Sequence, residues 1–165
     1  MKTTILSTNV IFGGLLLYSY YYYYIHNKKS FPKLWGNIQN KQPYIVSIFI
    51  AAACYLYILG YLLIQVNPTQ RNTILLKELN IQQIILIIIS ILWTPLSIMY
   101  IKNEESKPFL KLAILLVLFI VSMCSLLYYK TLSKLNVPKF VLICALIFFA
   151  HVFFGDFILW SYNFF

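Results

Sequence analysis

The chain has 165 residues, of which 61% are hydrophobic and 10% charged, and its formal net charge is +9 at pH 7. Its mean hydropathy is +0.79. A soluble core of this length cannot bury so much apolar surface, so we expect an integral membrane protein. The basic residues lie almost entirely in short connections between apolar runs. They suit anionic lipid headgroups there, and no connection is long enough to read nucleic acid.

Apolar runs of about 20 residues account for most of the chain, which is close to the length that crosses a hydrocarbon core of ~30 Å as a helix. We therefore predict an all-α fold, a polytopic, multi-pass bundle of five transmembrane helices. It forms one domain, residues 1–165. The predicted spans are about residues 4–25, 43–66, 81–101, 108–129 and 137–163.

The first run ends in a cluster of tyrosines, Tyr18 and Tyr20 to Tyr24. Amphipathic rings gather at the membrane–water interface, so this cluster is typical of an aromatic belt. The alternative is that the tyrosines line the mouth of a cavity. No small-residue cleavage site follows the run, so we interpret it as an uncleaved span rather than as a signal peptide.

The second run carries small residues at spacings of four and three, with Tyr57 on a neighbouring face. The small residues are Ser47, Ala51 and Cys54. Such stripes are typical of helix–helix packing in membranes. Between this run and the third, the polar segment 69–80 is expected to form a short amphipathic turn at the interface.

Polar side chains share one face of the third run. They are seven, four and three residues apart, so they lie on one side of an α-helix, which should face inward. The four residues are Gln83, Ser90, Thr94 and Ser97. Pro95 lacks an N–H and crowds the preceding turn, which predicts a kink. This part of the run is either a packing surface or a ligand-contact surface formed by Trp93, Thr94 and Ser97.

The last run places an ionisable pair, His151 and Asp156, at hydrocarbon depth. A charged group there costs roughly 2.5–3.5 kcal/mol on insertion scales, so it normally faces a protein interior or a wet cavity. In an α-helix the two residues are about 140° apart around the axis, which argues against a catalytic couple. Asp156 shares a sector with Trp160 and Asn163. The pair either fixes helix packing or serves a ligand or a proton pathway.

The sequence carries none of the short motifs that mark common catalytic or cofactor sites. The P-loop, the dinucleotide fingerprint, HExxH, CxxC and GxSxG are all absent, and no second carboxylate accompanies Asp156 inside an apolar run. The three cysteines lie in apolar runs, where a thiol behaves as a small hydrophobe. We therefore expect no enzyme activity, no metal site and no cofactor.

Five short-looped helices in a chain of this length resemble the TspO family, the tryptophan-rich sensory proteins also called peripheral benzodiazepine receptors or translocator proteins. The residues that carry the resemblance are Leu56-Tyr57 ahead of Gly60, Gln83 followed by Ser90-Ile91-Leu92-Trp93, and Pro138 at the start of the fifth run. The resemblance implies a helical pocket for a porphyrin, a sterol or a similar hydrophobic ligand, lined by Trp93 and residues of the second helix.

Three functional hypotheses follow. The first is a membrane protein that binds a small hydrophobic ligand, porphyrin- or sterol-like. Its candidate ligand-binding residues are Tyr57, Trp93, Thr94, Ser97, His151, Asp156, Trp160 and Asn163. The second is a small channel or transporter that uses Asp156 and His151. The third is a structural or assembly subunit of a larger membrane complex. A homodimer is the alternative assembly of the chain.

Overall fold

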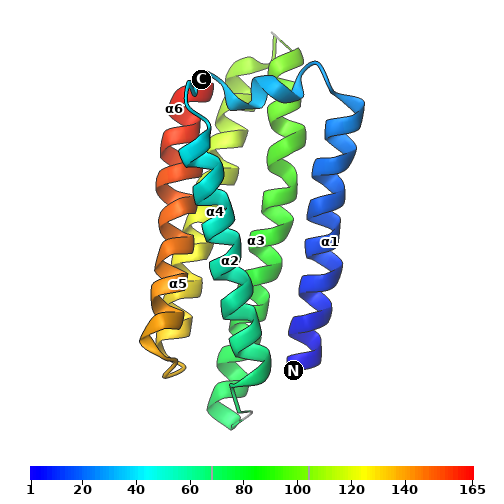
Figure 1. Ribbon diagram of the computed structural model, residues 1–165. Helices are drawn as coiled ribbons and strands as arrows, with labels where there is room; N and C mark the ends of the chain where they lie inside the picture. Colours follow the sequence, from blue (N-terminus) through cyan, green and yellow to red (C-terminus); the bar gives the residue numbers. More distant parts are fainter. Residues whose placement is uncertain (68, 104) are drawn as a thin grey trace.

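The computed structural model describes residues 1–67, 69–103 and 105–165. Within these ranges the regular structure is helical, without strands. The elements are α1 (Lys2–His26), the 3₁₀-helix η1 (Phe31–Trp35), α2 (Gln42–Ile64), α3 (Gln70–Lys102), α4 (Lys107–Ser133), α5 (Lys139–Ala150), the π-helix η2 (His151–Trp160) and α6 (Ser161–Phe164). Figure 1 shows the long helices running side by side, with η1 crossing one end of the bundle and the two termini at opposite ends.

Among the residues that the structure describes, four helical stretches are long and apolar enough to cross a membrane. They are Gln42–Ile64, Gln70–Lys102, Lys107–Ser133 and Lys139–Phe164, the last comprising α5, η2 and α6. The chain therefore has the multi-pass pattern of a membrane protein. Helix α1 covers the predicted first span but is not one of the four, because its tyrosines and other polar residues lower its hydropathy. That α1 crosses the membrane as a fifth span stays a prediction.

Helix α3 begins earlier than its apolar run. Its first residue is Gln70, and the side chain of the preceding Thr69 accepts a hydrogen bond of 3.2 Å from the backbone N–H of Asn72. This is the contact of an N-terminal cap, which supplies a partner for one of the free N–H groups of the first turn. The polar segment after residue 69 thus extends α3 instead of forming a separate interfacial turn. Pro95 lies inside α3 without ending it.

The polar face expected on the third run is turned inward. Gln83 is 1% exposed, and Thr94 and Ser97 are fully buried. Ser90 is half-buried, and its hydroxyl donates to the carbonyl of Leu86 at 2.8 Å. Helix α4 is the main partner of α3 in the bundle.

A hydrogen-bonded row of side chains links four helices in the core. Asn9 of α1 donates from Nδ2 to Gln83 Oε1 of α3 at 3.1 Å. The Tyr55 hydroxyl of α2 donates to Asn9 Oδ1 at 2.5 Å, and Gln83 Nε2 donates to the Tyr128 hydroxyl of α4 at 2.9 Å. This row holds α1 against the other helices through polar contacts, in addition to apolar packing.

Replacing Gln83 with leucine should destabilise the bundle by about 1–3 kcal/mol, because Asn9 and Tyr128 each lose a partner in a buried place. The loss would be measured by titrating the detergent-solubilised protein with SDS and following helicity by circular dichroism. The same replacement at the exposed Gln70 is the control and should have little effect. Equal losses for the two variants would contradict a role of the row in stability.

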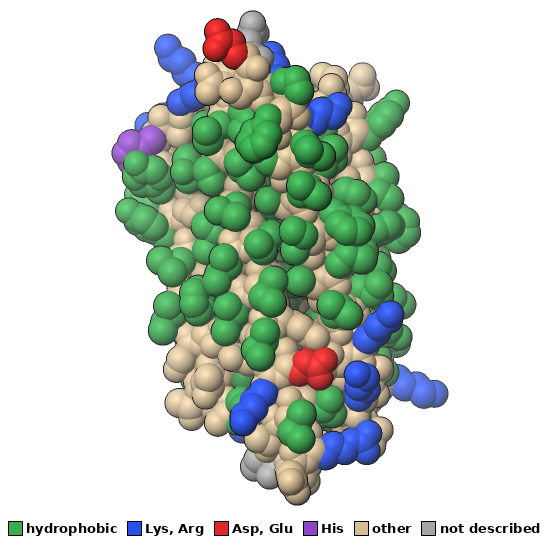
Figure 2. All heavy atoms as spheres, turned by 180° about the vertical axis from the view of Figure 1, so that it is seen from behind, with side chains coloured by type: hydrophobic (Ala, Val, Ile, Leu, Met, Phe, Trp, Pro, Cys, Tyr) green, Lys and Arg blue, Asp and Glu red, His purple; other side chains and the backbone are tan. Residues whose placement is uncertain are grey.

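The outer surface is apolar over its middle. Figure 2 shows hydrophobic side chains covering the central part of one face, with lysine and arginine near both ends. Large side chains that are more than half exposed include Leu17, Phe49, Ile64, Ile74 and Phe109. Soluble monomers rarely expose contiguous apolar patches of such extent, whereas a lipid-facing surface does.

Candidate functional site

An apolar cavity of about 290 Å³ lies among the helices, near the end of the bundle that η1 covers. Side chains of α1, η1, α2, α3, α4 and η2 all contribute to its wall. Its aromatic residues are Tyr20, Phe31, Trp35, Tyr44, Trp93 and Trp160. The chain has three tryptophans, and all of them line this cavity.

Two contacts join η1 and the residues just after it to the end of the last helical stretch, and they position this part of the wall. Trp160 donates from Nε1 to the carbonyl of Leu34 at 2.7 Å. The backbone N–H of Asn37 donates to the carbonyl of Asn163 at 2.9 Å. Trp160 is 2% exposed, and its ring stacks on that of Phe164 with centroids 4.3 Å apart.

The aromatic side chains of the wall meet edge to face. The ring centroids of Trp93 and Trp160 are 5.1 Å apart, and those of Trp35 and Tyr44 are 5.7 Å apart. Tyr20 meets Trp93 in the same manner at 6.3 Å. Edge-to-face contact is a favoured geometry for aromatic pairs, since the positive edge of one ring meets the negative face of the other. The wall therefore contains two groups of rings in contact, Tyr20–Trp93–Trp160 and Trp35–Tyr44.

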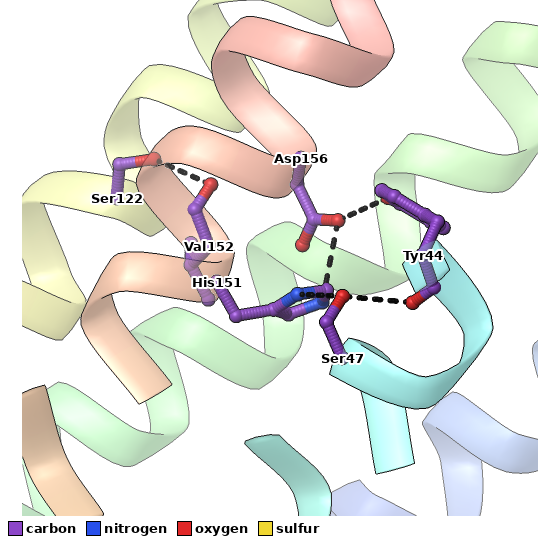
Figure 3. Close-up of polar contacts among 6 residues, drawn as sticks. All are labelled: Tyr44, Ser47, Ser122, His151, Val152 and Asp156. Atoms are coloured by element: carbon purple, nitrogen blue, oxygen red, sulfur yellow. Dashed lines mark hydrogen bonds and ion pairs between the residues drawn. The ribbon is translucent and has the colours of Figure 1, made fainter. Parts of the chain in front are cut away.

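Four polar side chains form one side of the site, as Figure 3 shows. The Tyr44 hydroxyl of α2 donates to Asp156 Oδ1. His151 Nε2 lies 3.6 Å from the same carboxylate oxygen. On the other side of the imidazole ring, His151 Nδ1 is 3.0 Å from Ser47 Oγ. Tyr44, Asp156, His151 and Ser47 thus form a continuous row between α2 and η2.

The Ser47 hydroxyl favours the His151 tautomer with its N–H at Nδ1. It donates to the carbonyl of Tyr44 at 2.8 Å, so its oxygen is left to accept from an N–H at His151 Nδ1. His151 Nε2 then faces Asp156, at a distance beyond the usual N–H···O range of 2.7–3.2 Å.

A π-helix brings His151 and Asp156 together, so the expectation of separate faces was wrong. That expectation assumed an α-helix, whereas residues His151–Trp160 form the π-helix η2. Hydrogen bonds in a π-helix join residues five apart, so the fifth residue returns nearly to the same side of the axis. The Ser122 hydroxyl of α4 lies 3.3 Å from the carbonyl of Val152 and ties η2 to its neighbour (Figure 3).

Gly155 leaves room for the imidazole ring. A Cβ atom at this position would lie 3.0 Å from His151 Nδ1 and 3.7 Å from Cε2 of Tyr44. The first distance is closer than ordinary van der Waals contact. The absence of a side chain at Gly155 therefore lets His151 lie beside the backbone of η2 and reach Ser47.

The structure brings some of the predicted site residues together and leaves others apart. Trp93, His151, Asp156 and Trp160 line the cavity. The other four are elsewhere. Thr94 and Ser97 are buried, and their hydroxyls have no hydrogen-bond partner among the described residues. Tyr57 is 45% exposed and packs against Phe140, and Asn163 donates to the carbonyl of Leu159 on its own helix.

Sequence reasoning missed Tyr20, Trp35, Tyr44 and Ser47. Trp35 lies in a short connection between apolar runs, and the sequence of that connection did not predict the 3₁₀-helix η1. Tyr20 belongs to the tyrosine cluster, and its place in the cavity wall fits the alternative of a tyrosine-lined mouth. Tyr44 and Ser47 are three residues apart and therefore share one side of α2. Two hydroxyl side chains on one side of α2 could have been predicted as partners for His151 and Asp156, and their spacing was the available signal.

The chain matches no protein-family model, no curated protein and no solved structure.

Proposed function

We propose that the protein is a multi-pass membrane protein that binds a small hydrophobic ligand in the cavity between its helices. The observation that carries this proposal is an aromatic cavity with a few polar groups, chiefly Asp156 and His151, on one side. Ligand sites usually have this composition, with apolar walls for affinity and a few polar groups for orientation.

A bundle of five transmembrane helices is the membrane arrangement that we favour. Four stretches have the required length and apolarity, and the exposed belt of large hydrophobic residues suits lipid chains. In α1, the amide of Asn9 has partners on α2 and α3. Internal partners for such a polar group are what a fifth span within the bilayer requires.

The volume of the cavity favours a small ligand. About 290 Å³ lies at the lower end of the range of roughly 300–1,000 Å³ that is usual for ligand pockets. The resemblance to the TspO family makes porphyrin and sterol analogues reasonable first probes. A macrocycle would enter this cavity only in part, whereas a one- or two-ring compound would fit inside it.

Binding can be followed by intrinsic fluorescence, because every tryptophan of the chain lines the cavity. We expect saturable changes in tryptophan emission when the purified protein is titrated with naphthalene, a fluorescent sterol or protoporphyrin. Val121→Phe adds volume at the wall and should weaken binding by tenfold or more. The matched variant Val46→Phe lies on the outer surface and should bind as wild type does. No saturable change with any of the probes would contradict the proposal.

The row of Tyr44, Asp156, His151 and Ser47 favours a second candidate, a small transporter that couples its substrate to protons. Ionisable side chains inside helical bundles are typical of such proton pathways. Proteoliposomes with a pH gradient would test this candidate, and Asp156→Asn should abolish a protein-dependent proton flux. The absence of such a flux in the wild-type protein would rule the candidate out.

A further inference from the structure

Asp156 has an incomplete set of partners inside the cavity. Among the described residues, the Tyr44 hydroxyl is its hydrogen-bond donor, and both Tyr44 and His151 approach the same oxygen, Oδ1. Figure 3 shows these dashed lines converging on one oxygen, with the second oxygen left outside them. The side chain keeps 31% of its surface exposed, and Asp156 is part of the cavity wall. The second oxygen is therefore available to a bound molecule.

His151 does not complete this set. Its Nδ1 contacts Ser47. Its Nε2 lies 3.6 Å from Oδ1 of Asp156, which is within ion-pair reach but outside hydrogen-bond distance, and Tyr44 already donates to that oxygen. No lysine or arginine occurs among the described residues that line the cavity. Burying a carboxylate in an apolar environment costs free energy unless a positively charged group lies in direct contact with it. A ligand that carries a positive charge would supply this partner.

The aromatic wall also favours a positively charged ligand. Rings of Tyr20, Trp35, Tyr44, Trp93 and Trp160 surround the space next to Asp156. The face of an aromatic ring is negative and attracts a cation, most strongly for tryptophan and where water is excluded. Sites that recognise quaternary ammonium groups combine several such faces. An anionic ligand would meet the negative carboxylate of Asp156 at this wall and would be disfavoured.

From this combination we infer that the site takes a small organic cation, namely a hydrophobic compound with a protonated amine or a quaternary ammonium group. Its positive nitrogen lies between the aromatic wall and the free oxygen of Asp156, and its apolar part fills the rest of the cavity. The inference rests on the proposed ligand site and names the chemical class of the ligand.

Two compounds of the same shape separate charge from hydrophobicity. Phenyltrimethylammonium carries a quaternary nitrogen, and tert-butylbenzene has a carbon in its place. Each is titrated against wild type and Asp156→Asn, in competition with naphthalene and read by tryptophan emission. Comparing the variant with wild type for one compound at a time cancels the partitioning of that compound into detergent.

We expect Asp156→Asn to weaken the binding of phenyltrimethylammonium by about tenfold or more and that of tert-butylbenzene by less than twofold. Glu105→Gln, the same chemical change at an exposed carboxylate, should alter neither. If circular dichroism shows that Asp156→Asn does not fold, Trp93→Leu replaces it. That variant removes one ring face and should weaken the binding of the cation several-fold more than that of its isostere.

Equal effects of the variant on the two compounds would overturn the inference and leave the hydrophobic ligand site standing. Binding of tert-butylbenzene without binding of phenyltrimethylammonium would likewise overturn the inference and leave the ligand site standing. Failure of both compounds and of naphthalene to bind would overturn the ligand site and the inference together.

Discussion

Replacing Trp160 by alanine should destabilise the protein by about 3–5 kcal/mol, the usual cost of truncating a buried large aromatic residue. The indole is 2% exposed, stacks on Phe164 and meets Trp93 edge to face at 5.1 Å. Its N–H is the donor to the carbonyl of Leu34, which would lose this partner. The substitution thus enlarges the cavity and loosens η1 at the same time.

The measurement is an SDS titration followed by circular dichroism, which does not depend on the tryptophan that is removed. Trp160→Phe serves as the matched variant. It keeps a ring against Phe164 and loses the N–H donor, so it should cost less than half as much as the alanine variant. A loss below about 1 kcal/mol for Trp160→Ala would be typical of a surface position and would contradict the packing described above.

The second large effect is expected at Gly36, which follows η1. Its backbone has φ +53° and ψ −134°, a conformation that residues with a Cβ rarely adopt. A Cβ atom here would also overlap backbone atoms of Asn163 and Phe164. Gly36→Ala should therefore cost about 3 kcal/mol or more, as the sum of backbone strain and the separation of η1 from the C-terminal turn.

Gly60→Ala is the control for this variant. Gly60 lies inside α2, and nothing lies within 4 Å of the position that its Cβ would take. Alanine is favoured over glycine inside a helix by about 0.5–1 kcal/mol, so this variant should be slightly stabilised. The same substitution thus has opposite expected signs at the two positions. A stabilising effect at Gly36 in the same SDS titration would show that the turn is not held as described.

The helical character of the chain was predictable because apolar runs of membrane-spanning length allow few other structures. The start of α3 was not predictable from hydropathy, because hydropathy does not detect a helix whose first turns are polar. The threonine cap at Thr69 is a local signal that would have corrected it. The inward polar face of α3 was predicted because the spacing of Gln83, Thr94 and Ser97 depends only on α-helical periodicity.

The candidate site was predictable only in part. Asp156, His151, Trp93 and Trp160 were selected because ionisable and tryptophan side chains are unusual within apolar helices. Their partners on other elements depend on which helix faces meet, and a single sequence does not contain that information. The relation of His151 to Asp156 depends on the π-helix, whose extra residue per turn leaves no mark in a hydropathy pattern.

The π-helix also determines how this pair would look in a related sequence. A π-helical turn is equivalent to an α-helical turn with one residue inserted. A homologue without that insertion would place the same imidazole and carboxylate side by side with three intervening residues instead of the four between His151 and Asp156. An alignment that treats the spacing as invariant would therefore miss equivalent sites, and one that allows a single-residue gap between them would find both forms.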